Sequence, residues 1–242
     1  SDDMTRQFLE AMGRGADWSE QKADAGAEYD KIIEINLDAL SALAASPHSP
    51  DAVTEVEGVA GAAVSQVVIG SCTNSSLDDL ASVAAVVRGR HIAPTVEAGI
   101  APGSRTTLLM AAKSGILGEL IAAGFRILES ACGPCIGQGF APNSGGVTLR
   151  TFNRNFKGRS GTADASVYLV SPETAAASAI TGVITSAEHL TYEDAAYQNG
   201  VRESLLAGKD ARLSAQDVRQ AACDEGMLIA PLDEERAATV EI

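Results

Sequence analysis

Strand-like and helix-like segments alternate through the middle of the sequence, and this alternation restricts the fold more than any other feature. Short apolar runs bounded by glycine or polar residues predict strands at residues 65–70, 95–100, 126–129, 147–152 and 167–170. The segments between and after them predict helices at residues 77–88, 105–113, 116–123 and 173–180. Such alternation with short loops predicts an α/β domain of three layers, α/β/α, with a mainly parallel sheet.

The segments on either side of this region do not show the same alternation of strand-like and helix-like patterns. We expect residues 1–60 to form a lead-in packed on the core, residues 61–190 to form the α/β domain, and residues 191–242 to hold helices and the start of a linker. Within the flanks, the pattern predicts helices at residues 2–12, 192–206 and 214–226, a strand at residues 29–37 and a helical turn at residues 40–45.

Composition excludes several classes of protein. The chain has 242 residues, 45% of them hydrophobic, enough for a large core, and a formal net charge of −14. That charge argues against binding nucleic acid or an anionic membrane surface. No apolar run approaches the roughly 18–20 residues of a membrane span. The acidic, polar start predicts no signal peptide, and four cysteines are too few for a disulfide scaffold, so we expect a reducing cytoplasm.

Three cysteines lie in polar, glycine-containing loops that follow predicted strands. Cys132 and Cys135 form a Cys-x-x-Cys pair in residues 131–139, and Cys72 lies in residues 70–76. Loops at the carboxyl ends of parallel strands gather at one edge of a sheet. Because cysteine thiolates hold iron–sulfur clusters, we predict that these three cysteines are cluster ligands. Three ligands on a four-iron cluster leave one iron open to act as a Lewis acid.

Other interpretations of the cysteines remain open at this point. A structural zinc site needs a fourth ligand, and His48, His91 and His189 lie far from the Cys-x-x-Cys pair in sequence. A redox dithiol is a further possibility, although such a pair usually begins a helix. The remaining interpretation is that the thiols are inert. Cys223, in a predicted helix, is expected to be a minor thiol without a role in the site.

A basic loop stands out in this acidic chain. Asn153, Arg154, Lys157 and Arg159 follow the predicted strand at residues 147–152. Guanidinium groups bind carboxylates through two parallel hydrogen bonds, so the loop is suited to hold a polycarboxylate beside the cysteines. The alternative is a solvated loop that pairs with surface acids.

Taken together and in this order, these motifs resemble the aconitase family. The three motifs are GSCTNSS at residues 70–76, ACGPCIG at residues 131–137 and NRNFKGR at residues 153–159. The resemblance covers roughly residues 1–190. It implies a 4Fe–4S cluster held by Cys72, Cys132 and Cys135, with Asn153, Arg154 and Arg159 binding substrate or groups near the cluster.

The resemblance also implies an activity and missing parts. The family isomerises citrate and isocitrate by dehydration and rehydration through cis-aconitate, a step of the tricarboxylic acid cycle, so a hydro-lyase acting on a small tricarboxylate is expected. Isopropylmalate isomerases share the fold but resemble the second cysteine loop less, which favours a bacterial-type aconitate hydratase. An isopropylmalate-isomerase-like or other hydroxy-acid hydro-lyase, or an iron–sulfur regulatory module, is the alternative. Family proteins are longer, and their other domains supply the acid and base residues. The chain is therefore expected to be the third domain and inactive alone.

Overall fold

The structure, a computed structural model, describes residues 1–190, and these divide into two units, residues 1–35 and residues 36–190. The helices predicted at residues 192–206 and 214–226, and Cys223, lie outside the described residues. The smaller unit holds α1 (Asp3–Ala11), which confirms the helix predicted at residues 2–12. The Asp2 side chain caps it by accepting a hydrogen bond from the Thr5 N–H at 2.9 Å.

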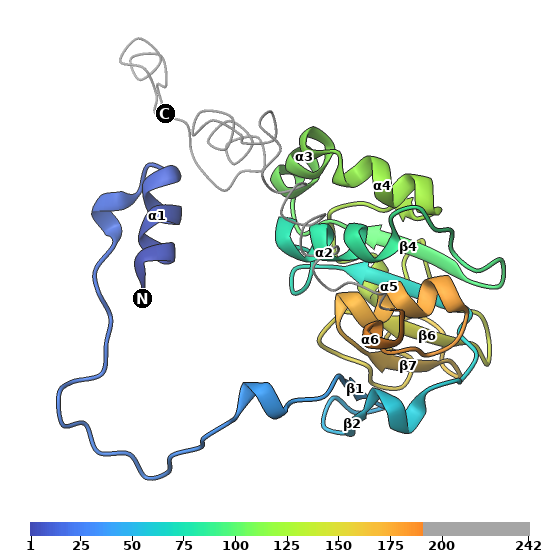
Figure 1. Cartoon of the computed structure of the whole chain (residues 1–242), viewed down its shortest axis with the longest axis horizontal. Coiled ribbons are helices and arrows are strands. Elements are labelled where there is room, and N and C mark those ends of the chain that lie inside the picture. The colour runs from blue at the N-terminus through green and yellow to red at the C-terminus, as the bar shows by residue number, and fades with distance from the viewer. Residues whose placement is uncertain (191–242) are drawn as a thin grey trace, which may run out of the picture. The chain divides into compact units, whose positions relative to one another are not determined.

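A seven-stranded, mainly parallel sheet organises the larger unit, with the strand order β2-β1-β7-β6-β3-β4-β5 (Figure 1). The strands are β1 (Leu43–Ala45), β2 (Val53–Glu55), β3 (Gln66–Gly70), β4 (Glu97–Ala101), β5 (Arg126–Ile127), β6 (Val147–Arg150) and β7 (Ser166–Leu169). Parallel pairing joins β5, β4, β3, β6 and β7, whereas β1 pairs antiparallel with β7 and β2. The predicted α/β class and mainly parallel sheet are confirmed, consistent with a three-layer α/β/α domain.

The chain reverses direction across the sheet at β3. From β3 it proceeds to β4 and β5 on one side, then returns to β6 on the other side of β3 and continues to β7. The register places Val67 opposite Ala98 on one neighbour and opposite Leu149 on the other. In open α/β sheets, ligands bind at the carboxyl ends of the strands where the strand order reverses. The carboxyl ends of β3 and β6 are therefore the expected place for a site.

Helices packed on the sheet form the larger core. Their bounds are α2 (Leu77–Val87), α3 (Arg105–Ser114), α4 (Ile116–Ala123), α5 (Pro172–Thr181) and α6 (Ala187–Leu190). Helix α2 contacts α4 and α5, and α5 contacts β3 (Figure 1). Val67 and Ile69 of β3 point into this core, which is rich in alanine and valine. The small side chains allow the helices to pack closely on the sheet.

A second, smaller cluster lies on the opposite face of β3. Because side chains alternate along a strand, Val68 points away from Val67 and Ile69. Val68 packs with Phe140 and Phe152, and Cys135 lies against this cluster. The long segment between β5 and β6 thus covers this face near the end of β3, where it brings its cysteines toward the sheet.

The structure corrects the predictions for residues 29–55. The strand predicted at residues 29–37 is wrong, since this stretch holds no strand and only the 3₁₀ helix η2 (Leu37–Ala39) begins at its end. The helical turn predicted at residues 40–45 is also wrong, because Leu43–Ala45 is strand β1, and β2 was not predicted at all. The remaining strands and helices within residues 64–181 are confirmed, with ends shifted by a few residues.

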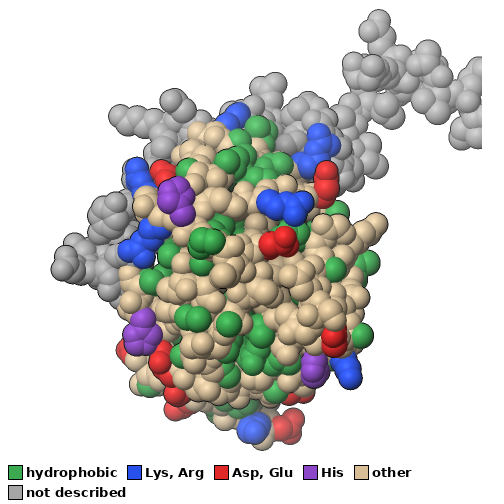
Figure 2. Space-filling view, turned by 90° about the vertical axis from the view of Figure 1, so that its right-hand side faces the viewer, with side chains coloured by type: hydrophobic (Ala, Val, Ile, Leu, Met, Phe, Trp, Pro, Cys, Tyr) green, Lys and Arg blue, Asp and Glu red, His purple; other side chains and the backbone are tan. Residues whose placement is uncertain are grey.

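On the face shown in Figure 2, acidic and basic side chains are scattered among larger uncharged areas. Within residues 1–190, no single helix is long and apolar enough to cross a membrane. Helices α3 and α4 have the length and composition of a membrane span only when they are taken together, and the chain bends by 87° between them.

Adjacent residues of α4 provide a test of the core assignment. Leu120 is 0% exposed, whereas its neighbour Ile121 is 54% exposed. We predict that Leu120→Ala lowers the free energy of unfolding by about 2–5 kcal/mol, because it removes buried methyl groups and leaves a cavity. Ile121→Ala, a matched truncation on the same helix, should change it by about 0.5 kcal/mol or less. Urea unfolding measures both, and equal losses would contradict the packing of α4.

Candidate metal centre

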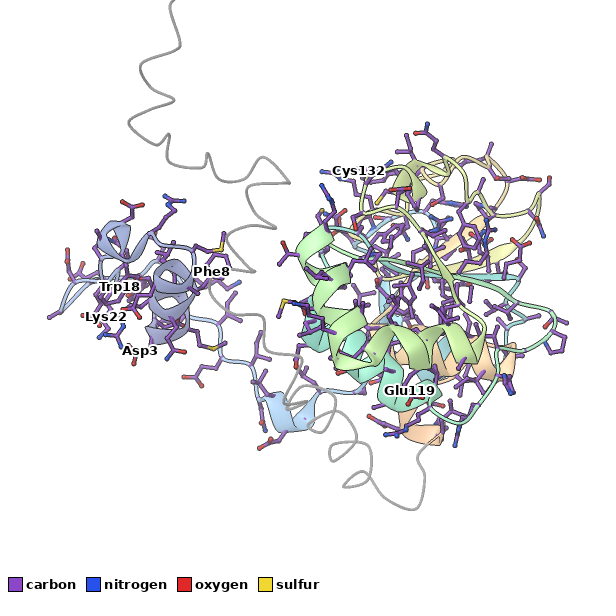
Figure 3. The ribbon with its side chains drawn as sticks, turned by 90° about the horizontal axis from the view of Figure 1, so that it is seen from above. Asp3, Phe8, Trp18, Lys22, Glu119 and Cys132 are labelled. Atoms are coloured by element: carbon purple, nitrogen blue, oxygen red, sulfur yellow. The ribbon has the colours of Figure 1, made fainter. Side chains whose placement is uncertain are left out.

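The candidate site lies in loops at the carboxyl ends of β3, β5 and β6. Cys72 follows β3, the segment with Cys132 and Cys135 runs from β5 to β6, and the basic loop of residues 153–159 follows β6. Figure 3 shows Cys132 at the outer edge of the larger unit, apart from the part of α4 that holds Glu119. Parallel pairing of β3 with β6 therefore brings the first cysteine loop next to the basic loop.

A sharp turn at the end of β3 sets the direction of the Cys72 loop. Gly70 has φ +136°, and a Cβ there would lie 2.0 Å from the Ala101 carbonyl oxygen, so only glycine fits. Ser71 follows with φ 66°, a left-handed conformation that is rare for a residue with a side chain. The Ser71 N–H donates to Ala101 O at 3.0 Å, and Ser75 Oγ donates to Ser71 O at 2.7 Å. These bonds hold the loop in place before Ser76 caps α2.

Thr151, the first residue after β6, joins the Cys72 loop to the basic loop. The Gly70 N–H donates to Thr151 Oγ1 at 2.8 Å, and Asn74 Nδ2 donates to Thr151 O at 2.6 Å. The Thr151 side chain is fully buried. Buried hydrogen bonds of this kind are costly to break, so the two loops are fixed relative to one another.

The Cys132–Cys135 loop closes on itself and packs against the end of the basic loop. The Cys135 N–H donates to Cys132 O at 3.1 Å at the start of the 3₁₀ helix η4 (Pro134–Ile136). Gly137 ends η4 with φ +81°, and a Cβ there would lie 2.1 Å from Ser160 O. Because Ser160 directly follows Arg159, this close approach places the second cysteine loop beside that arginine.

The electrostatic surroundings of Cys135 show which predicted residues are brought together. Burial raises the pKa of the Cys135 thiol, while a hydrogen bond from Ser71 and the positive charge of Arg159 lower it. Cys132 and Cys72 also act on it, each raising the pKa as like charges. Cys135 is half-buried, whereas Cys72 and Cys132 are exposed, and all three thiols are free. Cys72, Cys132 and Arg159 thus all lie near enough to Cys135 to act on its charge, on loops at the carboxyl edge of the sheet.

The other residues of the basic loop lie differently. Asn153 and Arg154 are exposed on the loop, and Arg159 is half-buried. Asn155 is fully buried, and its Nδ2 donates to Ser46 O at 2.8 Å and to Val167 O at 3.1 Å. Asn155 thus anchors the loop to the end of β1 and to β7, which leaves its neighbours free to face outward.

The donor set fits a cluster better than a single ion. Within residues 1–190, no three His, Cys, Asp or Glu side chains are grouped closely enough to hold one metal ion. Zinc, bound at about 2.3 Å by each sulfur, would require its thiolates within about 4 Å of one another. In a four-iron cluster each thiolate binds a different iron atom, so the sulfurs stand farther apart. The three thiols are free, two of them exposed and one half-buried, and thiolates are the ligands that such a cluster uses.

A hollow of about 880 Å³ lies beside the second cysteine loop. Its lining includes Arg105 and Leu108 of α3, Leu128 after β5, and Gly133 and Pro134 of the loop, but none of the described cysteines. The size is typical of sites for small molecules. The hollow therefore lies against the loop that presents Cys132 and Cys135, with Ala131 and Gly133 on either side of Cys132 in its lining.

Two residues near the rim were missed by the sequence analysis. Ser71 lowers the pKa of the Cys135 thiol, and Arg150, at the end of β6, donates one hydrogen bond to the carbonyl of Pro134. The signal for Arg150 was a charged residue inside an otherwise apolar strand. The position of Ser71 depends on a left-handed backbone that no residue pattern reveals.

Comparisons with known proteins agree with the motifs. A family model described as Aconitase family (aconitate hydratase) matches residues 1–182. The large subunit 2 of 3-isopropylmalate dehydratase from Archaeoglobus fulgidus is 43% identical over 186 residues, 76% of this chain and 44% of that protein. The homoaconitase large subunit of Thermus thermophilus is 44% identical over 184 residues, again 76% of this chain and 44% of the relative. The chain thus spans about half the length of the curated relatives it matches.

Two glycines of the cysteine loop provide a matched test of its packing. Gly137 and Gly139 both have positive φ, but only at Gly137 would a Cβ meet another atom within 4 Å. Either change to alanine costs about 1–3 kcal/mol from the backbone alone. We predict that Gly137→Ala lowers the free energy of unfolding further than Gly139→Ala, and that it alone impairs uptake of iron and sulfide. Equal behaviour of the two variants in denaturant unfolding and iron analysis would contradict the packing.

Proposed function

This chain belongs to the aconitase family, and from that premise we propose that it forms the cluster-binding part of a hydro-lyase. The reaction removes water from a hydroxy-polycarboxylic acid and adds it back at the neighbouring carbon. The observation that supports this most directly is that the loops with Cys72, Cys132, Cys135 and Arg159 all lie at the carboxyl edge of the sheet, where Cys72, Cys132 and Arg159 act on the Cys135 thiol. We also propose a cytoplasmic location, where thiols stay reduced.

In this proposal Cys72, Cys132 and Cys135 hold a 4Fe–4S cluster at the exposed rim. When bound, such a cluster supplies an iron atom with an open position that polarises hydroxyl and carboxylate oxygens as a Lewis acid. Ser71 donates a hydrogen bond to the Cys135 sulfur, which stabilises its thiolate form. The exposure of Cys72 and Cys132 leaves the loops that would hold the cluster accessible from solvent.

The basic loop binds the substrate in this proposal. Arg154 and Arg159 would each form paired hydrogen bonds with a carboxylate, and Asn153 would add a neutral donor and acceptor. The formal net charge of −14 repels anions in general, so a local group of guanidiniums is needed to attract a polycarboxylate. The acid and base groups would come from the rest of the protein, since the matched residues make up only 44% of each of these relatives.

The substrate is a further part of the proposal. The sequence favoured aconitate hydratase. The relatives named above are large subunits of 3-isopropylmalate dehydratase and homoaconitase, so the alternative of an isopropylmalate-isomerase-like or other hydroxy-acid hydro-lyase fits at least as well. A role in the tricarboxylic acid cycle is not supported by these relatives. We therefore propose a hydroxy-dicarboxylic or hydroxy-tricarboxylic acid as substrate. We also propose that the remaining domains and a smaller subunit complete the enzyme, because the relatives are named as large subunits.

Anaerobic incubation of the 242-residue chain with ferrous iron and sulfide tests the cluster. We predict a brown product with the broad visible absorbance of a 4Fe–4S cluster, and loss of that absorbance in Cys72→Ser, Cys132→Ser or Cys135→Ser. Cys223→Ser is the matched control and should keep the full absorbance. An unchanged spectrum in Cys72→Ser, with a reversible dithiol confined to Cys132 and Cys135, would instead support a redox pair.

Arg159 can be tested in an enzyme assembled from this chain and the remaining domains and subunit. We predict that Arg159→Lys raises KM about tenfold to a hundredfold, because one bidentate charged pair contributes about 1.5–3 kcal/mol. Lys157→Gln, on the exposed part of the same loop, should leave KM near its original value. Assays with 3-isopropylmalate and with citrate, followed by the unsaturated product, also identify the substrate. An unaltered KM in Arg159→Lys would remove Arg159 from the binding site.

A further inference from the structure

We propose that Arg150 is a positioning residue for the cluster: it holds the second cysteine loop by its carbonyl groups and places one buried positive charge beside the thiolates. This inference rests on the proposed function, because the partner of that charge is the cluster. Arg150 is the last residue of β6 and is separate from the predicted substrate arginines of the basic loop.

The guanidinium of Arg150 lies beneath the cysteine loop. Its side chain is 0% exposed, which is rare for arginine. Nη1 donates to Pro134 O at 2.5 Å, and Nη2 donates to Phe140 O at 3.2 Å. Pro134 lies between the two cysteines of the loop, and Phe140 lies just beyond them. One planar group therefore fixes both ends of the segment that presents Cys135.

Gln66, the first residue of β3, completes this arrangement. Its Oε1 accepts a hydrogen bond from Arg150 Nη2 at 2.8 Å and another from Thr148 Oγ1 at 3.1 Å. Its Nε2 donates to Ala141 O at 3.0 Å. Gln66 and Arg150 together bind three carbonyl groups within residues 134–141. The loop, which has no strand of its own, is thereby attached to the two central strands of the sheet.

The charge of Arg150 has no carboxylate partner among residues 1–190. Its neighbours are carbonyl groups, the neutral amide of Gln66 and the ring of Phe152, whose centroid lies 5.4 Å from the guanidinium carbon. The Nε–H is buried without any hydrogen-bond acceptor in the described part of the chain. Burial and the like charge of Arg159 lower the pKa of Arg150 to about 10, while Cys135 raises it, so the group stays charged at neutral pH.

A buried charge without a counter-charge is costly, so a site that retains one usually has an anion to balance it. Cys135 is the acidic group that acts on Arg150. Thiolates that ligate a cluster supply lasting negative charge at that position, whereas protonated thiols supply none. The same positive charge also stabilises the cluster further when it gains an electron, because hydrogen bonds and charges around a cluster set its reduction potential.

The reduction potential of the reconstituted cluster in the full 242-residue chain tests this electrostatic role. The cluster is titrated with dithionite and redox mediators, and it takes up one electron per cluster. We predict that Arg150→Met makes reduction about tenfold less favourable, a shift of about 59 mV to more negative potential for one electron. Gln66→Glu should act in the same direction, because a carboxylate beside Arg150 neutralises it while still accepting its hydrogen bond.

Two control variants separate charge from structure. Arg126→Met removes another guanidinium, one that lies 5.0 Å from the Phe140 ring on the exposed strand β5, and should shift the potential little because solvent screens that charge. Arg150→Lys keeps the charge but loses the planar fork, so its potential should stay near the original value. Unchanged potentials in both Arg150→Met and Gln66→Glu would overturn the electrostatic role. Should Arg150→Met fail to fold, Gln66→Glu and Arg150→Lys decide the question.

Hydrogen exchange of the cluster-free chain tests the loop-holding role independently of the cluster. We predict faster exchange across residues 132–141 in Arg150→Met and Arg150→Lys, with helix α2 unaffected, and no change in Arg126→Met. Unchanged exchange in both Arg150 variants would overturn the positioning role. Failure of the unaltered chain to take up a cluster would instead contradict the proposed function and, with it, the electrostatic role.

Discussion

The parallel pairing of β3 with β6 determines where the loops of the candidate site lie. It places the two strand ends that lead into the Cys72 loop and the basic loop side by side, at the point where the chain reverses direction across the sheet. Thr151 then joins the loops by accepting from Gly70 and Asn74. Without this pairing, Cys72 and Arg159 would have no structural reason to lie near one another.

The second cysteine loop depends on the same two strands, although it begins at β5 on the edge of the sheet. Its attachment comes from Gln66 at the start of β3 and Arg150 at the end of β6. The cluster of Val68, Phe140 and Phe152 supports it from the apolar side. Polar and apolar contacts from neighbouring strands thus bring a long, irregular segment to a defined position at the rim.

The sequence predicted the parts of the fold that local patterns determine. Residues 65–70 contain the apolar run Val67–Ile69 that ends at Gly70, so β3 could be recognised without its partners. Residues 29–37 also hold β-branched residues, but Ile32, Ile33 and Ile35 are exposed and pair with no strand among residues 1–190, so their pattern was misleading. Leu43–Ala45 forms a strand because β7 and β2 pair with it, and such pairing cannot be read from three residues. Arg150 was missed for a related reason, since its carbonyl partners come from a different segment.

We propose that Cys72, Cys132 and Cys135 bind one iron–sulfur cluster at the carboxyl edge of the sheet. An anomalous difference map recorded at the iron absorption edge, from crystals of the anaerobically reconstituted protein, measures this most directly. We predict one compact iron peak that lies within bonding distance of all three sulfurs. Its remaining side should face the solvent and the basic loop. A peak bound only by Cys132 and Cys135, or iron bound away from Cys72, would contradict it.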